Sequence, residues 1–202
     1  MIVTDKGLVK SKLVNEITDI INERNINYVI YDKIEANPKD YNVEHCAKIA
    51  IHESVDAIVA FGGGSSIDAA KAVTVLSKQG GKVRDYTDKS KIKDDCLPLI
   101  TIPTTAGTGS EITFSSVITD TKEKFKFTIK STAIAARVAI IDPELTLTLP
   151  PVITASTGID ALTHAIEGYT VNCTNPIAES VGLYAVELIS DSIVEAVKNG
   201  NN

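Results

Sequence analysis

The 202-residue sequence predicts an α/β fold in which a doubly wound parallel sheet is followed by the start of an all-helical region. Up to residue 150, short apolar runs typical of buried parallel strands alternate with segments whose apolar residues have helical spacing. After Pro150 and Pro151, two long segments show helical spacing alone. We therefore predict an α/β domain over residues 1–150 and the beginning of a helical domain over residues 151–202. Two helices cannot enclose a core of their own, so we expect the second domain to be incomplete.

The predicted strands of the first domain are rich in apolar and β-branched residues. They comprise residues 2–4, 26–32, 56–62, 98–103 and 137–142. The helices between them are predicted over residues 8–24, 39–53 and 66–78. Ser65 or Ser66 is the expected N-cap of the last of these helices. Two further β-rich segments, 112–119 and 124–129, flank a charged turn and predict an antiparallel hairpin appended to the sheet.

The second domain is predicted to contain two helices, over residues 153–171 and 176–198. Pro176 suits the first turn of the second helix, because a first-turn residue needs no backbone N–H, and Gly200 suits its C-terminal end.

Composition and charge narrow the class of protein. The net charge is −6 and no block of basic residues is present, which argues against a nucleic-acid partner. No apolar run approaches the roughly 18 residues that a membrane span needs, and the N-terminus lacks the pattern of a signal peptide. Cys46, Cys96 and Cys173 are odd in number and far apart, so we interpret them as reduced thiols, most of them buried. Together these features predict a cytoplasmic protein.

A glycine-rich turn is the first candidate binding feature. The sequence FGGGSSIDAAK, residues 61–71, places three glycines between a buried strand and the N-terminus of a helix. Backbone N–H groups and the helix dipole favour a phosphate group there, so a nucleotide diphosphate is the expected ligand. The residue pattern of this segment matches neither the Walker loop nor the standard dinucleotide-binding fingerprint. A tight turn that needs glycine only for its backbone conformation remains the alternative.

A second loop follows the next strand. The sequence TIPTTAGTGSE, residues 101–111, combines small hydroxyl residues with two glycines, so a ligand can approach its backbone closely. Two such loops at strand ends predict a ligand crevice at the carboxyl edge of the sheet. Asp5, directly after the first strand, can accept hydrogen bonds from the adenosine ribose and repel a 2′-phosphate, which would favour NAD over NADP. A turn-initiating aspartate is the alternative interpretation.

Asp160 and His164 are four residues apart, on one face of a predicted helix. A carboxylate oxygen and an imidazole nitrogen suit a divalent metal such as Fe²⁺ or Zn²⁺. An ordinary hydrogen bond along the helix face is the alternative for this pair.

Four motifs, VTDKGLV, GGGSSIDAAK, PTTAGTGSE and GIDALTHAIEGY, resemble in order and spacing the iron-containing (group III) alcohol dehydrogenase family. The resemblance covers essentially the whole chain. It implies a Rossmann-like dinucleotide-binding domain, a helical metal-binding domain and an active site in the cleft between them. The implied reaction is hydride transfer between NAD and a small alcohol, diol or aldehyde, with a metal as Lewis acid. The full-length parent is expected to be a homo-oligomer.

The resemblance also assigns individual residues. The implied metal ligands are Asp160 and His164, and the implied cofactor-binding residues are Asp5, Asn37, Gly63, Gly64, Ser65, Asp68, Thr104, Thr105, Thr108 and Lys126. The family's two remaining ligands are histidines, and no histidine follows His164. We therefore expect a fragment truncated at both ends and inactive by itself. Two alternatives stay open: a nucleotide-binding module without catalysis, and a zinc-dependent polyol or glycerol dehydrogenase.

Overall fold

The computed structural model describes residues 1–172 and 175–200 of the chain. The chain divides into two compact units. The first comprises Met1–Pro103 and Ser110–Ile141, and the second comprises Thr104–Gly109 and Asp142–Asn202. The loop after the fourth strand thus groups with the helical part of the chain.

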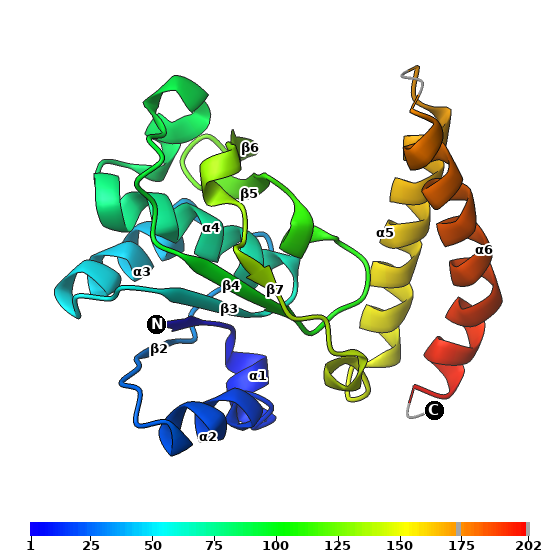
Figure 1. Cartoon of the computed structure of the whole chain (residues 1–202), viewed down its shortest axis with the longest axis horizontal. Helices are drawn as coiled ribbons and strands as arrows, with labels where there is room; N and C mark the ends of the chain where they lie inside the picture. The colour runs from blue at the N-terminus through cyan, green and yellow to red at the C-terminus, as the bar shows by residue number, and fades with distance from the viewer. Residues whose placement is uncertain (173–174, 201–202) are drawn as a thin grey trace. The chain divides into compact units, whose positions relative to one another are not determined.

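A five-stranded parallel sheet forms the centre of the first unit (Figure 1). Its strand order is β2-β1-β3-β4-β7. The strands are β1 (Ile2–Val3), β2 (Ile30–Tyr31), β3 (Ile58–Gly62), β4 (Leu99–Pro103) and β7 (Val138–Ala139). β3 and β4 pair over their full length, from Ile58 opposite Leu99 to Gly62 opposite Pro103. The predicted α/β class is confirmed.

Helices α1 (Lys6–Lys10), α2 (Asn15–Glu23), α3 (Asp40–His52) and α4 (Gly64–Gln79) accompany this sheet. α4 is the central helix, because its residues from Ser66 to Leu76 are buried apart from Asp68. It lies against α3, β3 and the hairpin strand β5 (Ser115–Asp120). Alanine, valine and isoleucine on almost every side of α4 explain this central position, since a helix that is apolar all round must be covered all round.

The first predicted helix, over residues 8–24, is instead two helices. Lys12, between α1 and α2, has a φ of 65°, in the left-handed region that a continuous helix cannot accommodate. The apolar spacing continues through this break, so the pattern alone could not locate it.

The predicted hairpin is present but forms a sheet of its own. β5 pairs in antiparallel register with β6 (Phe125–Lys130), and these two strands make a separate two-stranded sheet. The prediction that the hairpin extends the main sheet was therefore wrong. The hairpin packs against α4 and is also bonded to the start of α3: the Thr119 N–H donates to the carbonyl of Pro38 at 2.8 Å, and the Thr121 hydroxyl donates to Asp40 at 2.8 Å.

The second unit contains α5 (Pro151–Thr170) and α6 (Pro176–Lys198), packed against one another (Figure 1). Each begins with a proline in its first turn, as the sequence predicts for Pro176. Asn175 caps α6, since its side chain accepts hydrogen bonds from the N–H groups of Ile177 and Ala178. At Gly158 a Cβ atom would lie 2.2 Å from Cδ1 of Ile193, so α6 packs closely over this glycine.

Shorter features complete the fold. Among the described residues, 3₁₀ segments lie at Val83–Thr87, Lys89–Lys91, Ser110–Ile112, Thr132–Ile134 and Pro143–Thr146. Cys46 is buried and Cys96 half-buried, both as free thiols, while Cys173 lies outside the described residues. Within the described ranges, no helix has the length and apolar character to cross a bilayer.

Candidate cofactor site and metal pair

The turn from β3 into α4 depends on Gly62. Its φ is +151°, a backbone conformation that side-chain-bearing residues rarely adopt. A Cβ atom at Gly62 would also lie 2.7 Å from Oγ and 2.9 Å from Cβ of Ser66. Gly62 was not among the predicted cofactor residues, which included its neighbours Gly63 and Gly64. The run of three glycines contained the signal, but the pattern could not say which one the backbone requires.

The N-terminus of α4 directly follows this turn. The helix begins at Gly64 with Gly63 as N-cap, so the predicted cap by Ser65 or Ser66 was wrong. Within the part of the chain that the structure describes, no side chain makes a capping hydrogen bond to this helix end. Gly63, Gly64 and Ser65 are each half-buried. The first-turn N–H groups of a 16-residue helix therefore lack the usual side-chain acceptor, which is the arrangement that binds phosphate groups.

Asn37 and Ser65 are brought together at the edge of this turn. The Asn37 N–H donates to Oγ of Ser65 at 3.2 Å, and the Asn37 carbonyl accepts a hydrogen bond from the Thr119 hydroxyl at 3.3 Å. Asn37 has a φ of 54°, and its side chain is exposed. The structure thus places one of the predicted cofactor residues beside the helix N-terminus.

Asp5 caps helix α1. Its Oδ1 accepts hydrogen bonds from the N–H groups of Gly7 at 2.7 Å and Leu8 at 3.1 Å. These contacts match the turn-initiating alternative, and they occupy Oδ1 alone. The predicted contact with an adenosine ribose therefore requires Oδ2.

The threonine loop begins where β4 ends, at Pro103, the register partner of Gly62. The glycine turn and this loop thus leave neighbouring strands at paired positions. Thr104 is buried, and Thr105 has a buried Oγ1 that meets no hydrogen-bond partner within the described structure. An unsatisfied buried hydroxyl costs about 1–3 kcal/mol, so this atom suits a site completed by a ligand. Thr108 is half-buried.

The loop lies tightly on α5 in the second unit. At Gly107 a Cβ atom would lie 2.1 Å from the carbonyl oxygen of Thr157. Glycine is therefore required at this position for close approach of two backbones.

Asp68 lies in the second turn of α4, and both of its carboxylate oxygens are engaged. Oδ1 accepts a hydrogen bond from Oγ of Ser110 at 2.5 Å, and Oδ2 accepts one from the Val117 N–H at 2.9 Å. Burial raises the pKa of this carboxyl group, which the hydrogen bonds partly offset. The predicted role of Asp68 at the cofactor stays a prediction, whereas its contacts to residues 110 and 117 are direct.

Lys71, one turn further along α4, is fully buried and was not selected by sequence analysis. Its ammonium group donates to the carbonyl oxygens of Ser110 at 2.6 Å and Ser115 at 2.9 Å, and to the Thr113 hydroxyl at 2.8 Å. The only signal in the sequence was a lysine within an otherwise apolar helix. Lys126, which was selected, lies on the exposed face of β6 opposite Thr119.

Asp160 and His164 lie on one face of α5 in the second unit. Asp160 Oδ1 and His164 Nε2 are 3.9 Å apart, too far for the hydrogen bond considered as the alternative. The side chains are 45% and 54% exposed, so both groups are available to a ligand. An oxygen and an imidazole nitrogen suit Fe²⁺ or Zn²⁺. No cluster of three or more potential metal ligands occurs among the residues described.

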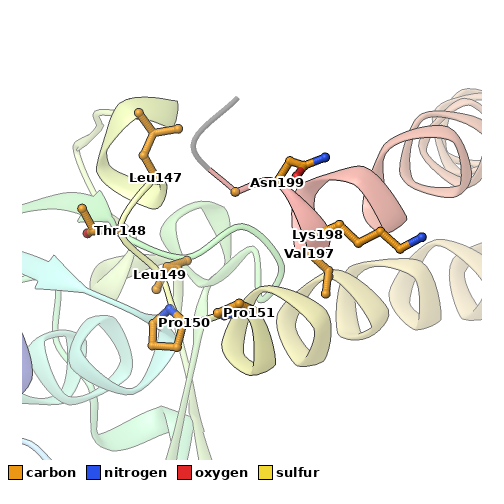
Figure 2. A pocket seen from close by; sticks show the side chains of 9 residues that line it. Leu147, Thr148, Leu149, Pro150, Pro151, Val197, Lys198 and Asn199 are labelled. Carbon is orange, nitrogen blue, oxygen red and sulfur yellow. The ribbon is translucent and has the colours of Figure 1, made fainter.

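A cavity of about 620 Å³ also lies in the second unit, lined by residues 147–151 and 197–200 (Figure 2). Its lining includes the start of α5, whereas Asp160 lies nine residues further along that helix, about 14 Å away at 1.5 Å per residue. The cavity is therefore separate from the candidate metal pair.

Comparison with known proteins identifies the family. The model of the family described as iron-containing alcohol dehydrogenase matches residues 1–143, and the C-terminal model of the same family matches residues 154–202. The chain belongs to the iron-containing alcohol dehydrogenase family. The resemblance drawn from the four motifs is confirmed.

Individual relatives agree with this assignment. The chain is 39% identical over 202 residues to alcohol dehydrogenase 4 of Saccharomyces cerevisiae, covering 100% of this chain and 53% of that protein. It is 42% identical over 205 residues to choline dehydrogenase of Bacillus subtilis, covering 100% and 51%. The crystal structure of sulfoacetaldehyde reductase from Bifidobacterium kashiwanohense with NAD⁺ matches with a TM-score of 0.94 and 37% identity, covering 100% and 53%. The chain thus spans about half the length of the relatives it matches.

The geometry at Gly62 leads to a stability prediction. Gly62→Ala should lower the free energy of unfolding by about 3 kcal/mol, since it combines backbone strain with overpacking against Ser66. Gly80→Ala is the matched control, because Gly80 also has a positive φ, +70°, but has no atom within 4 Å of the added Cβ. We expect the control to lose only the backbone contribution, about 1–2 kcal/mol in urea denaturation, because its φ of 70° and ψ of −154° also strain an alanine. Equal losses for the two variants would contradict the close contact with Ser66.

Proposed function

We propose that this chain forms the cofactor-binding part of an NAD-linked, metal-dependent alcohol dehydrogenase that acts on small alcohols, diols or their aldehydes. The observation that carries the proposal is the uncapped N-terminus of α4 directly after the glycine turn, in a chain that belongs to the iron-containing alcohol dehydrogenase family. NAD would supply the hydride acceptor. The residues of this chain bind and orient it.

The phosphates are assigned to the start of α4. The N–H groups around Gly63, Gly64 and Ser65 provide donors at the positive end of the helix dipole. Gly63 and Gly64 carry no side chain that would keep a pyrophosphate from the backbone. This placement also puts the adenosine toward Asn37, whose N–H is bonded to Ser65.

The preference for NAD is assigned to Asp5. Its Oδ1 is fixed by the cap of α1, which holds Oδ2 in a defined orientation after β1. A carboxylate in this place would accept hydrogen bonds from ribose hydroxyls and repel a 2′-phosphate. The remaining predicted contacts, from Thr104, Thr105, Thr108 and Lys126, are assigned to the other half of the dinucleotide.

Asp160 and His164 would hold the metal. Their spacing on α5, their exposure and their O and N donors fit a borderline divalent ion. When bound, the ion supplies Lewis acidity at the substrate oxygen. The donor set suits iron and zinc alike, so a zinc-dependent polyol or glycerol dehydrogenase is the nearest variant of the proposal.

A nucleotide-binding module without catalysis is the competing proposal. It is favoured by one observation: the described residues bring two potential ligands together in α5 and no cluster of three. Two protein ligands hold a divalent ion more weakly than four, because water takes the vacant positions.

Cofactor preference tests the assignment of Asp5. We expect the wild-type chain to bind NAD more tightly than NADP in isothermal titration calorimetry. Asp5→Asn keeps an equally good N-cap but removes the charge, so NADP affinity should rise about tenfold. Asp19→Asn, at an exposed position of α2, is the charge-matched control and should change neither affinity. Wild-type affinity for NADP equal to that for NAD would refute the role of Asp5.

Activity separates the two proposals. With Fe²⁺, NAD and 1,2- or 1,3-propanediol, the 202-residue chain should form negligible NADH while still binding NAD. Asp160→Ala and His164→Ala should each abolish the weak binding of Zn²⁺ measured by calorimetry. NAD reduction at about 1 s⁻¹ or faster would show that the chain itself is a complete enzyme and would eliminate the competing proposal.

A further inference from the structure

The buried ammonium group of Lys71 makes contacts that are confined to one segment. Its three strongest hydrogen bonds go to Ser110, Thr113 and Ser115, at 2.6, 2.8 and 2.9 Å. A fourth, longer contact of 3.2 Å reaches Oγ of Ser110. An ammonium group has three N–H donors, so these acceptors satisfy its full capacity.

Asp68 bonds to the same segment from one turn earlier on α4. Besides its bonds to Ser110 and Val117, its main-chain carbonyl accepts a hydrogen bond from the Ser116 hydroxyl at 2.7 Å. Asp68 Oδ1 lies 3.9 Å from Nζ of Lys71, so the two charges also interact directly. Two consecutive turns of α4 therefore hold residues 110–117 by hydrogen bonds to side chains and backbone.

Stability alone does not account for a charge in this place. Moving an ammonium group out of water is costly, and apolar residues of similar volume often replace buried ion pairs without loss of stability. Apart from Asp68 and Thr74, the neighbours of Lys71 on α4 are alanine, valine and isoleucine, which pack without any such cost. A lysine at this position donates directional hydrogen bonds to Ser110, Thr113 and Ser115. An apolar side chain could fill the same space but could not fix the position of these residues.

The segment that Lys71 holds connects two parts of the proposed cofactor site. Ser110 follows Gly109, the end of the threonine loop, and Ser115 is the first residue of β5. Ser115 pairs with Lys130 of β6, and four residues later Thr119 pairs with Lys126. The helix whose N-terminus is proposed to bind the phosphates thus also fixes where the Lys126 hairpin begins.

We propose that Lys71 is a positioning residue that places the Lys126 hairpin as one wall of the dinucleotide site, by tying residues 110–117 to α4. This inference rests on the proposed function, because it assumes that NAD binds at the start of α4. The phosphate site at Gly63–Ser65 lies more than one helical turn before Lys71 on the same helix and does not depend on the ammonium group. Ligands that use only the phosphate site should therefore be insensitive to Lys71.

The charge of Lys71 also predicts how NAD affinity depends on pH. Burial lowers its pKa to about 8, while Asp68 on α4 and Glu111 on the Ser110–Ile112 segment act in the opposite direction. When Lys71 loses its proton, the neutral amine has two N–H donors for its three acceptors at Ser110, Thr113 and Ser115. Its lone pair then faces carbonyl oxygens, which repel it. NAD affinity should therefore fall as the pH rises through about 8.

Global stability should respond to this lysine in the opposite sense. The pKa of an unfolded lysine, about 10.4, is higher than the pKa of Lys71 in the folded state. Between these values the unfolded chain binds more protons, so the contribution of Lys71 to stability rises with pH. A residue that only supported the fold would not weaken NAD binding over a range in which its contribution to stability increases.

Calorimetric titration of NAD and of ADP, which shares the adenosine diphosphate half, tests the inference. Lys71→Met keeps a long unbranched side chain without donors, and we expect it to weaken NAD binding at least tenfold while ADP binding changes less than threefold. Lys78→Met, an exposed position near the end of α4, is the control and should change neither. In wild-type protein the ratio of the ADP to the NAD dissociation constant should fall above pH 8, and in Lys71→Met that pH dependence should vanish.

The outcomes are distinguishable. Unchanged NAD affinity in Lys71→Met, or an equal loss for NAD and ADP in a folded variant, would overturn the role of Lys71 while leaving the proposed function standing. Failure of the wild-type chain to bind either ligand would overturn the proposed function and the inference with it. If Lys71→Met does not fold, the wild-type pH profile decides alone: a ratio that stays flat from pH 7 to 9 overturns the proposal.

Discussion

The close approach of Gly62 to Ser66 is the constraint on which the rest of the first unit depends. A turn this tight lets α4 begin two residues after β3 ends, so the helix N-terminus stands at the carboxyl edge of the sheet. The paired position on β4, Pro103, starts the threonine loop at the same edge. A wider turn with a side chain at Gly62 would move α4 along its axis and displace every group that the helix carries.

In the proposed site, α4 combines two functions that usually belong to separate elements. Its first turn offers uncapped N–H groups to an anion, and its second and third turns bury Asp68 and Lys71 to hold a distant segment. The opposed charges, one turn apart, reduce the cost of burying each. In the proposed site, the phosphate donors and residues 110–117 would thus be tied to one helix, which lowers the entropy lost on binding a dinucleotide.

The sequence was sufficient for the features that depend on local patterns. Apolar strands alternating with segments of helical spacing predicted the parallel sheet, and Pro176 predicted the start of α6. The sequence was insufficient for features that depend on contacts between residues far apart in the chain. The helix break at Lys12 leaves the apolar spacing intact, and the partners of the buried Lys71 lie some forty residues away, in residues 110–117. Likewise, spacing placed Asp160 and His164 on one face but could not show that they stand too far apart to bond to each other.

The central claim is that the start of α4 binds the phosphates of a dinucleotide, and amide chemical shifts measured during a titration with NAD test it most directly. We predict that the largest saturable shifts belong to the N–H groups of Gly63, Gly64 and Ser65, since these would become donors to the pyrophosphate. Saturable shifts confined to other parts of the chain, with these three amides unmoved, would contradict the account.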